Sequence, residues 1–300
     1  MWQLQLGGVT VSRVGEMLAP GFDPAFLFPA FDPAVFDEDP QLLGPNFWDA
    51  ATGKLMSSMQ SWLMRTGRDV VLMDTGCGND KVRKEPAFRR FHQLSLPYLA
   101  TLEAAGVRPE DVTVVVNTHL HVDHIGWNTR LQNGRWVPTF PRARYLIGRA
   151  EWTHWQDPRG GPALHPEGVP AIMDSVLPVW DAGLVDLVDD GDEVLPGLVA
   201  RAAPGHTAGQ LAYELRSAGA AGVFTADVFH QPMQVVRPDR NIRYCEVPDV
   251  AVATRRRHLG EAASSGAMLF PFHPGAPHAG RVRDTPQGLR FVPLDASELG

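Results

Sequence analysis

The sequence predicts an α/β fold in one domain. Short apolar segments typical of strands fall in two sets, and segments with helical periodicity separate them. The chain has 300 residues, of which 44% are hydrophobic, which is enough for one large buried core. No internal repeat or linker-like stretch divides it, so we expect residues 1–300 to form a single domain.

The first set of expected strands lies in the N-terminal half. Residues 1–15 alternate apolar and polar side chains around a Gly-Gly pair, which predicts a hairpin. Further on, a run of leucines and aromatics predicts a helix that Gly106 ends. The further elements expected here are strands at 62–64 and 70–73, a helix at about 88–105 and a strand at 111–116.

The second set of expected strands lies in the C-terminal half, after another helical segment. The same criteria of apolar content, alternation and flanking turn residues apply. The elements expected here are a helix at 174–182, strands at 184–188, 198–203, 210–216 and 222–226, a helix at 249–264 and a strand at 268–272.

An arm at about residues 20–50 differs from the rest because prolines and aromatics recur throughout it. The prolines predict that it contains no regular helix or strand. Its aromatic side chains must be covered, either by the arm's own domain, or by a second subunit or a pocket. This arm is the only reason in the sequence to expect a homodimer.

Composition excludes several classes of protein. A net charge of −7 leaves no basic footprint for a nucleic-acid partner. No run approaches the roughly 20 apolar residues that span a bilayer, and the N-terminus shows no secretory signal. The two cysteines, Cys77 and Cys245, cannot build a disulfide framework. We therefore expect a cytoplasmic protein with reduced thiols.

Four metal-binding side chains follow the expected strand at 111–116 within six residues: His119, His121, Asp123 and His124. Each would need a hydrogen-bond partner or pay a desolvation cost beside the core. A divalent metal ion meets that need, because imidazole and carboxylate are its natural ligands. The first three alternate by two and point the same way, whereas His124 opens onto the other side. One segment can therefore serve two adjacent metal ions.

Three later residues stand at the ends of expected strands, where loops carry functional groups on a rigid scaffold. His206 lies in a turn-rich loop between two strands, Asp227 ends a strand, and His273 follows the last one. Taken singly, each is more often structural than functional. Their appearance together, in this order behind the first cluster, predicts that they belong to the same metal site.

These motifs resemble the metallo-β-lactamase superfamily. The resemblance rests on His-x-His-x-Asp-His at 119–124, Pro-Gly-His-Thr at 204–207, Ala-Asp at 226–227 and His273. Asp74, in Asp-Thr-Gly, resembles a recurrent loop of the same proteins. The likeness runs from about residue 55 to residue 280. It implies an αββα sandwich of two mixed β-sheets flanked by helices, with the metals at one edge of the sheets.

The resemblance also implies how the ligands divide. His119, His121 and His206 would hold the first metal, and Asp123, His124 and His273 the second, with Asp227 as the bridging ligand. Asp74 would orient a ligand histidine, since metal-bound imidazole needs an acceptor for its other nitrogen. The expected cofactors are two divalent ions, zinc by default, with iron, manganese or cobalt also compatible with these ligands.

Two such ions imply a hydrolase. A hydroxide shared by the metals, with a pKa lowered to about 7, would attack an ester, lactone or phosphotriester. Asp123, Asp227 and His230 are the expected catalytic residues, with Asp227 or His230 protonating the leaving group. The likeness is closest to methyl-parathion-hydrolase-like enzymes and acyl-homoserine-lactone lactonases. Lactonases also use a tyrosine near the metals, and none stands at 150–200 here, which counts against a lactonase.

The substrate is expected to be a hydrophobic small molecule. Candidate pocket residues are Phe28, Trp48, Trp127, Asn128 and Trp152, and a core role for each aromatic is the alternative. The alternative function is a superfamily member with weak turnover that binds or signals through a small molecule. A nuclease of this fold is disfavoured by the acidic charge, and di-iron redox chemistry favours a carboxylate where His121 stands.

Overall fold

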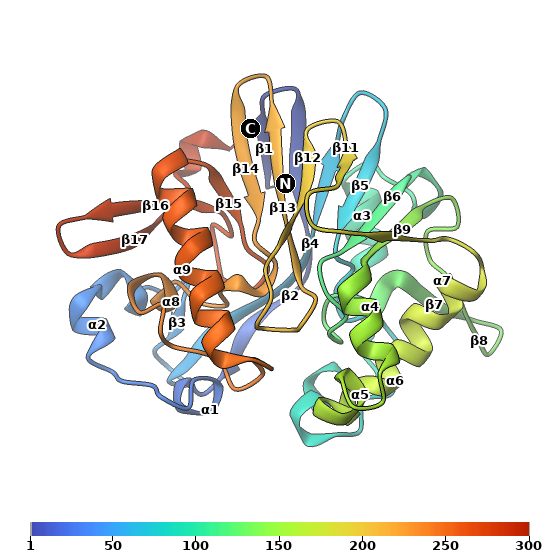
Figure 1. The fold of residues 1–300 in the computed structure, drawn as a ribbon, viewed down its shortest axis with the longest axis horizontal. Coiled ribbons are helices and arrows are strands. Elements are labelled where there is room, and N and C mark those ends of the chain that lie inside the picture. Colours follow the sequence, from blue (N-terminus) through green and yellow to red (C-terminus); the bar gives the residue numbers. More distant parts are fainter. Residues whose placement is uncertain (1, 300) are drawn as a thin grey trace. The chain divides into compact units, whose positions relative to one another are not determined.

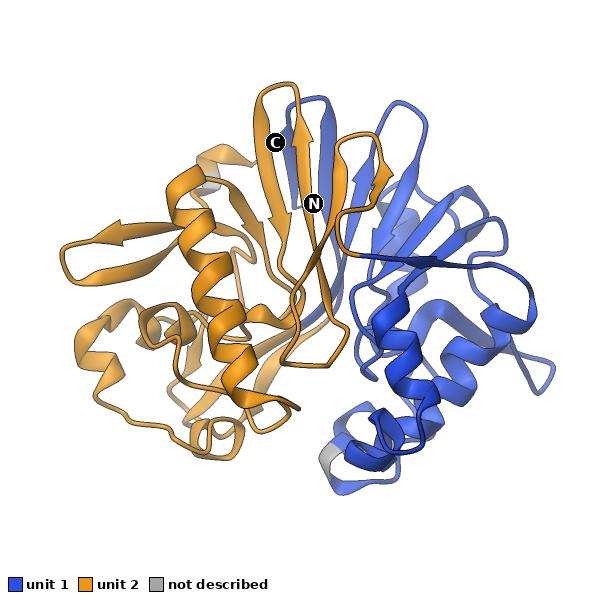
Figure 2. Cartoon of the chain, viewed as in Figure 1, with its two compact units in different colours: residues 1–16, 59–189 blue, residues 17–58, 190–300 orange. Residues whose placement is uncertain are grey.

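The structure, a computed structural model, describes residues 2–299. The chain forms two compact units, which Figure 2 distinguishes by colour: unit 1 contains residues 1–16 and 59–189, and unit 2 contains residues 17–58 and 190–300. The boundaries fall inside two long strands, β2 (Val9–Phe22) and β4 (Lys54–Arg65). The single domain expected from the sequence stays a prediction.

The first large sheet is mixed, with the strand order β1-β2-β4-β5-β6-β9-β10 and β3 paired to β4 (Figure 1). Strands β5, β6, β9 and β10 run parallel to one another, whereas the pairs β1–β2 and β4–β5 are antiparallel. The new strands are β1 (Gln3–Leu6), β3 (Trp48–Asp49), β5 (Val70–Met73), β6 (Val114–Asn117), β9 (Arg144–Gly148) and β10 (Val185–Val188), and a separate hairpin joins β7 (Thr129–Gln132) to β8 (Arg135–Pro138).

Short helices complete unit 1. Its main core packs Val115 and Tyr145 of the sheet with Tyr98 and Leu102 of α3, and all four side chains are buried. The helices are α3 (Tyr98–Ala104), α4 (Arg149–Gln156), α5 (Gly161–Leu164), α6 (Val169–Ala171), a π-helical turn (Ile172–Val176) and α7 (Leu177–Asp181), with 3₁₀ turns at Pro86–Phe91, Pro109–Asp111, Gly126–Asn128 and Pro166–Gly168.

Unit 2 contains the second large sheet, with the order β11 to β17 in sequence. It is antiparallel except for the parallel pair β14–β15, so this sheet is also mixed. The strands are β11 (Glu193–Leu195), β12 (Leu198–Ala202), β13 (Leu211–Ser217), β14 (Ala220–Phe224), β15 (Met268–Phe270), β16 (Gly280–Thr285) and β17 (Gly288–Pro293).

The long helix α9 packs on this sheet. Leu259 and Ala262 of α9 lie against Leu269 and Val282 of β15 and β16 in one apolar cluster. The helices of unit 2 are α1 (Pro24–Leu27), α2 (Val35–Glu38), α8 (Met233–Val236) and α9 (Pro248–Ser265), with 3₁₀ turns at Pro40–Leu43, Ala226–Val228 and Ala296–Glu298.

The arm at 20–50 corrects one prediction, because it does contain regular elements. Strand β2 runs into it as far as Phe22, and short helices follow. Pro24 and Pro40 stand in the first turn of a helix, where the missing N–H is not needed. Phe28 and Trp48 pack in an apolar cluster of unit 2. This burial favours an arm that packs on its own domain.

A second correction concerns the helix expected at about 88–105. Only Tyr98–Ala104 is α-helical, because Pro97 supplies no backbone N–H and stands at the N-cap. Gly106, with a φ of +74°, ends the helix as predicted. Strand β9 and helix α4 were not expected from the sequence. The hairpin of β7 and β8 was not expected either, although its Asn133-Gly134 turn is a strong hairpin signal.

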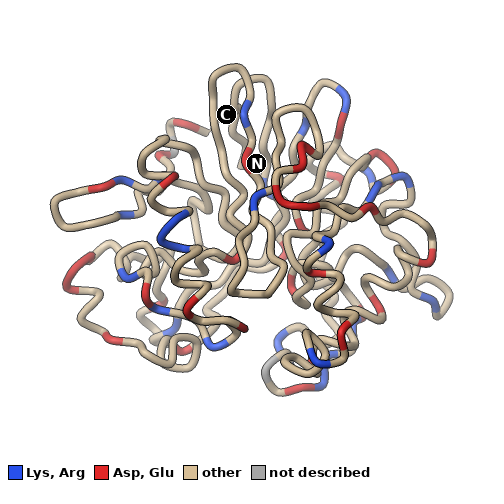
Figure 3. Tube along the Cα trace, viewed as in Figure 1, with Lys and Arg blue, Asp and Glu red and all other residues tan. Residues whose placement is uncertain are grey.

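Positive and negative residues are distributed over both units, as Figure 3 shows. Within residues 2–299, no helix combines the length and the apolar character that crossing a bilayer requires.

Candidate metal centre

The ligand segment of unit 1 begins where β6 ends. Strands β5 and β6 are parallel neighbours, so their carboxyl ends lie at the same edge of the sheet. Asp74 directly follows β5, and Thr118 and His119 follow β6 by one and two residues. The sheet therefore brings Asp74 to the ligand segment, although 44 positions separate it from Thr118.

Asp74 orients two imidazoles of this segment. Its carboxylate accepts the His124 Nδ1–H at 2.7 Å, and the backbone N–H and the hydroxyl of Thr118, each at 2.8 Å. Because the Thr118 hydroxyl donates to Asp74, its oxygen accepts from His119 Nδ1 at 3.0 Å. Both imidazoles then carry their lone pair on Nε2, which is the tautomer that binds a metal ion.

The four predicted ligands of unit 1 lie together. The ring of His119 lies 4.7 Å from that of His121 and 4.2 Å from that of His124, between centroids. The Nε2 atom of His124 lies 3.8 Å from Asp123 Oδ1. His165, which the sequence did not single out, places its ring 5.5 Å from His121. Burial raises the pKa of Asp74, and the hydrogen bonds from His124 and Thr118 oppose that rise.

Backbone contacts hold the segment against the loop after β5. The Thr75 N–H donates to His124 O at 2.7 Å, and the Gly126 N–H donates to Gly76 O at 2.7 Å. A Cβ at Gly126 would stand 1.9 Å from the Cys77 carbonyl, so only glycine fits there. Glu151 of α4 accepts the backbone N–H of Leu120, which stands between two predicted ligands, at 3.0 Å.

Glu16 of strand β2 forms hydrogen bonds with the same loop. Its buried carboxylate accepts the N–H groups of Cys77 at 2.6 Å and Gly78 at 3.0 Å, and the indole N–H of Trp127 at 2.7 Å. Burial raises the pKa of Glu16, and these three donors oppose the rise. Burial also raises the pKa of the Cys77 thiol, with a contribution from Glu16, so Cys77 stays protonated and is no nucleophile.

In unit 2 the predicted ligands also follow strand ends. Strands β12 and β14 are both antiparallel to β13, and β15 is parallel to β14. All three strands therefore run in the same direction, and their carboxyl ends share one edge. His206, Asp227 and His273 stand three or four residues beyond these ends.

Asp227 is the centre of the unit 2 set. The Nε2 atoms of three buried histidines lie near its carboxylate oxygens: His206 at 3.2 Å, His230 at 2.9 Å and His273 at 3.1 Å. The rings of His230 and His273 stack with centroids 4.9 Å apart. His206, Asp227 and His230 offer ligand atoms close enough for one metal ion.

The tautomer of His273 indicates that its Nε2 atom and the Asp227 carboxylate need a cation between them. Its Nδ1 lies 3.1 Å from the carbonyl oxygen of Ser58, which can only accept, so Nδ1 carries the hydrogen. A neutral His273 therefore points the Nε2 lone pair at the Asp227 carboxylate. Two acceptors 3.1 Å apart repel unless a cation or a proton lies between them. The residues thus fit a metal ion.

The histidines around Asp227 titrate differently. Burial lowers the pKa of His206, but the hydrogen bonds to Asp227 and Cys245 outweigh it and raise the pKa to about 10. Burial lowers the pKa of His230 to about 4, against the attraction of Asp227. The Asp227 carboxylate is shared by several imidazoles and attracts positive charge. A metal ion bound there would supply that charge and keep His206 neutral.

The candidate pocket residues have mainly internal contacts. Phe28 is fully buried and Trp48 half-buried in the apolar cluster of the arm. Trp127 stacks on Tyr98 in the core of unit 1, and Asn128 is buried. Trp152 differs, because it lines an apolar hollow of about 290 Å³ in unit 1.

Several supporting residues were not found from the sequence: Glu16, Thr118, Glu151, His165 and the carbonyl of Ser58. Only Glu16 had a usable signal, since it shares the inward face of its strand with Val14, two residues earlier. The others depend on contacts between segments distant in the sequence.

The chain belongs to the metallo-beta-lactamase superfamily, whose family model matches residues 59–283. Curated relatives include an N-acyl homoserine lactonase of Bacillus sp, 28% identical over 158 residues, which are 49% of this chain and 54% of that protein. Another, from Bacillus thuringiensis, is 26% identical over 168 residues, 52% of this chain and 58% of that protein. The chain thus matches little more than half the length of these relatives.

Solved structures share the fold over nearly the whole chain. Hydrolase AbOPH of the beta-lactamase superfamily has a TM-score of 0.81 at 24% identity, covering 98% of this chain and 97% of that one. AidC, a dizinc quorum-quenching lactonase in complex with a product, has a TM-score of 0.77 at 22% identity, with the same coverage. The predicted αββα metallo-β-lactamase fold is confirmed.

Proposed function

We propose that this protein is a dinuclear metal-dependent hydrolase of ester, lactone or phosphotriester bonds. His119, His121 and His206 would hold the first ion, and Asp123, His124 and His273 the second, with Asp227 shared. Membership of the metallo-beta-lactamase superfamily supports this assignment. The chemistry of each ligand set, taken by itself, supports it as well.

One observation carries the proposal. His124 in unit 1 and His273 in unit 2 both donate Nδ1–H to a fixed oxygen and turn the Nε2 lone pair toward a carboxylate. A buried lone pair facing a carboxylate is unfavourable without a cation. Two independent ligand sets have this arrangement, which favours metal binding over a structural histidine cluster.

When bound, divalent ions lower the pKa of a coordinated water and polarise a carbonyl or phosphoryl oxygen. The protein's own residues provide orientation and a dry surrounding. Asp74 fixes the tautomers of His119 and His124, and Ser58 O fixes that of His273. Burial of these groups excludes bulk water, so the hydrogen bonds act in a low dielectric.

We assign His230 a positioning role. Its Nε2–H donates to Asp227 Oδ2 at 2.9 Å, and its low pKa keeps the ring neutral near pH 7. A neutral imidazole is a poor acid, so leaving-group protonation falls to Asp227 or to water. His230→Gln should lower kcat without moving the basic limb of the pH–rate profile. Loss of that limb would make His230 the acid.

The substrate we propose carries a hydrophobic group. In unit 1, Trp152, Trp155, Ile172 and Leu177 line the apolar hollow of about 290 Å³. The segment that follows α4 also contains His165, whose ring contacts the ligand His121. An apolar hollow in the helical segment that also touches a ligand suits an acyl or aryl substituent.

Metal analysis tests the first part of the proposal. Protein purified without chelator should contain close to two ions per chain. Zinc, manganese, iron and cobalt should each be added back to chelator-treated protein, since the ligands suit all four. A folded chain that binds none of them would overturn the assignment.

A turnover screen tests the second part. Metal-loaded protein should be assayed on aryl esters, acyl lactones and phosphotriesters, with the Asp227→Ala variant as a blank. Hydrolysis of one class, absent from the blank, supports the hydrolase. Tight binding of these compounds without turnover would support the alternative, a binding or signalling protein. Hydrophobic substrates should be turned over better than short-chain analogues.

A further inference from the structure

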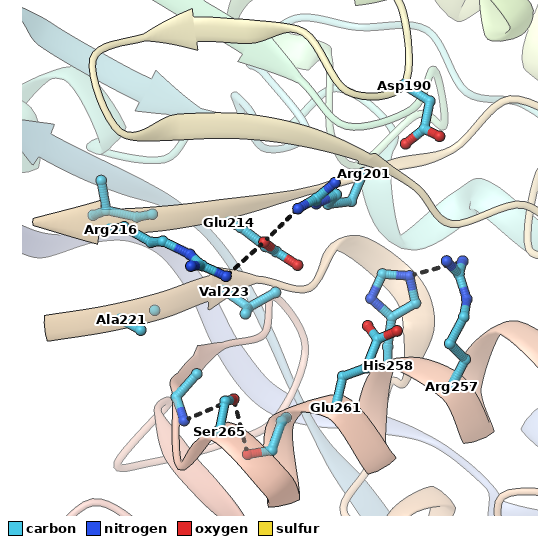
Figure 4. Close-up of a pocket in the computed structure, with 14 residues that line it drawn as sticks. Asp190, Arg201, Glu214, Arg216, Ala221, Val223, Arg257, His258, Glu261 and Ser265 are labelled. Atoms are coloured by element: carbon cyan, nitrogen blue, oxygen red, sulfur yellow. Dashed lines mark hydrogen bonds and ion pairs between the residues drawn. The ribbon is translucent and has the colours of Figure 1, made fainter.

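A polar hollow of about 410 Å³ lies in unit 2, between strands β12–β14 and helix α9 (Figure 4). Every residue that lines it belongs to this unit, and none is a predicted metal ligand. Its main ionisable residues are Arg201, Glu214, Arg216, Arg257, His258 and Glu261. Arg201, Glu214 and His258 are half-buried there, and Arg216, Arg257 and Glu261 are exposed at its rim.

The strand wall carries positive charge around one carboxylate. Glu214 Oε2 lies 3.1 Å from Arg201 Nη2 and 3.9 Å from Arg216 Nη2, as the dashed lines in Figure 4 show. The Nε of Arg201 is buried and has no hydrogen-bond partner in the described part of the chain. A buried N–H donor without an acceptor is costly, so this wall would gain from an anionic ligand group.

The helix wall offers acceptors. His258 and Glu261 are three residues apart on α9 and project toward the strands (Figure 4). The Nε2 of His258 lies 3.3 Å from both Ala202 O and Arg257 Nη2, so either ring nitrogen can carry the hydrogen and the other can accept. Burial lowers the pKa of His258, which keeps the ring neutral. The side chain of Glu261 is exposed and forms no hydrogen bond or ion pair with residues 2–299. This wall would gain from a cationic group.

We propose that this hollow binds a small zwitterion of amino-acid size, with its carboxylate at Arg201 and its ammonium at Glu261. The formal charges of the lining arginines balance those of Asp190, Glu214 and Glu261, so the site suits a ligand that is neutral overall. A simple anion would be repelled by the carboxylates of Glu214 and Glu261, which line the same hollow. A simple cation would leave the Arg201 Nε–H without an acceptor.

Calorimetry with glycine, β-alanine, γ-aminobutyrate and ε-aminocaproate tests the proposal, because this series varies the separation of the two charges. At least one should bind with a dissociation constant of about 1 mM or lower, whereas acetate and methylammonium should bind at least about tenfold more weakly. No heat from any amino acid, or equal binding of acetate, would overturn it.

Two variants locate the site. Arg201→Gln and Glu261→Gln should each weaken binding about tenfold, the effect of losing one charge-assisted hydrogen bond. Arg256→Gln, on an exposed neighbour in α9, and Asp284→Asn, on β16, are matched controls that should bind normally. Unchanged binding by Glu261→Gln would overturn the proposal. If a variant fails to fold, hydrogen exchange of α9 and β13 is measured instead in the native protein, with and without a saturating amino acid. Exchange should slow when the amino acid is bound, and unchanged exchange would contradict the site.

Discussion

The two units hold their predicted ligands in different ways. In unit 1, four ligands occupy six consecutive positions after β6, and the side chain of Asp74 fixes the tautomers of His119 and His124. In unit 2, three loops supply one ligand each, and a backbone carbonyl, Ser58 O, fixes His273. The first set depends on side chains that a substitution can remove, whereas the second depends partly on the backbone.

Both sets nevertheless follow one geometric rule. In unit 1 the predicted ligands follow β6, and Asp74, which orients them, follows the parallel strand β5. In unit 2 the predicted ligands follow β12, β14 and β15, which run in the same direction. Loops at such an edge converge because the strands are parallel. The difference teaches that a predicted ligand set can come from one loop or from several converging loops.

The largest effect is expected at Asp227, which contacts three imidazoles. Asp227→Asn removes a charged ligand, and we expect loss of at least one ion per chain and a fall in kcat/KM of about a thousandfold, since metal polarisation is worth several kcal/mol. Plasma emission spectrometry and steady-state kinetics measure both. Asp284→Asn, an exposed carboxylate on β16, is the control. A variant with full metal content would contradict the central place of Asp227.

Asp74→Asn and Ser58→Ala test side-chain against backbone orientation. Asp74→Asn presents a weaker, neutral acceptor to His124, and metal affinity should fall about 10- to 100-fold. Ser58→Ala keeps the carbonyl that accepts from His273, so affinity should change little. Competition titration against a chromophoric chelator measures the difference. Equal losses in the two variants would remove the distinction drawn between the units.

Glu16→Gln tests how far unit 1 depends on its second buried acid. The amide cannot accept all three N–H donors, and its own NH₂ would face one of them. The free energy of unfolding should fall by about 1–3 kcal/mol, the cost of unsatisfied buried donors. Urea unfolding measures it, with the exposed Glu103→Gln on α3 as the matched control. A loss no larger than that of the control would show that Glu16 is dispensable.

Lys81 should make the stability of unit 1 rise with pH in the alkaline range. Burial lowers its pKa from 10.5 to about 7, against the attraction of Asp174. Between these values the unfolded chain binds a proton that the folded chain lacks, so stability should rise with pH from about 7 toward 10.5 and stay at its lower level below pH 7. Lys81→Met should abolish this contribution. Urea unfolding of both proteins at several pH values measures it, and identical slopes would contradict the assignment.

The smallest expected difference concerns cooperativity. Seven of the eight tryptophans, all except Trp48, lie in unit 1, whereas α9 lies in unit 2. If the chain is a single domain, tryptophan fluorescence and hydrogen exchange of α9 should report the same urea midpoint. Separate midpoints would show two domains and contradict the single-domain prediction.

Much of the site was predictable because its signals are local. The spacing of His119, His121, Asp123 and His124 indicates a metal site without any knowledge of the fold. Likewise, apolar runs and alternation located strands β5, β6, β12, β13 and β14 within about three residues of their observed bounds. Strands β16 and β17, which are exposed in part, lack that signal and were missed, and the mostly buried strand β9 was missed as well.

By itself, the sequence determined an α/β chain of the metallo-β-lactamase kind and the order of seven candidate ligands. Only the tertiary structure decided what supports them: that Glu16 and Asp74 meet the loops of unit 1, that Ser58 O meets His273, and that Phe28 and Trp127 are core residues. The physical reason is that periodicity and spacing depend on neighbours along the chain. Burial and hydrogen-bond partners depend on strand order and register, which bring together residues far apart in sequence.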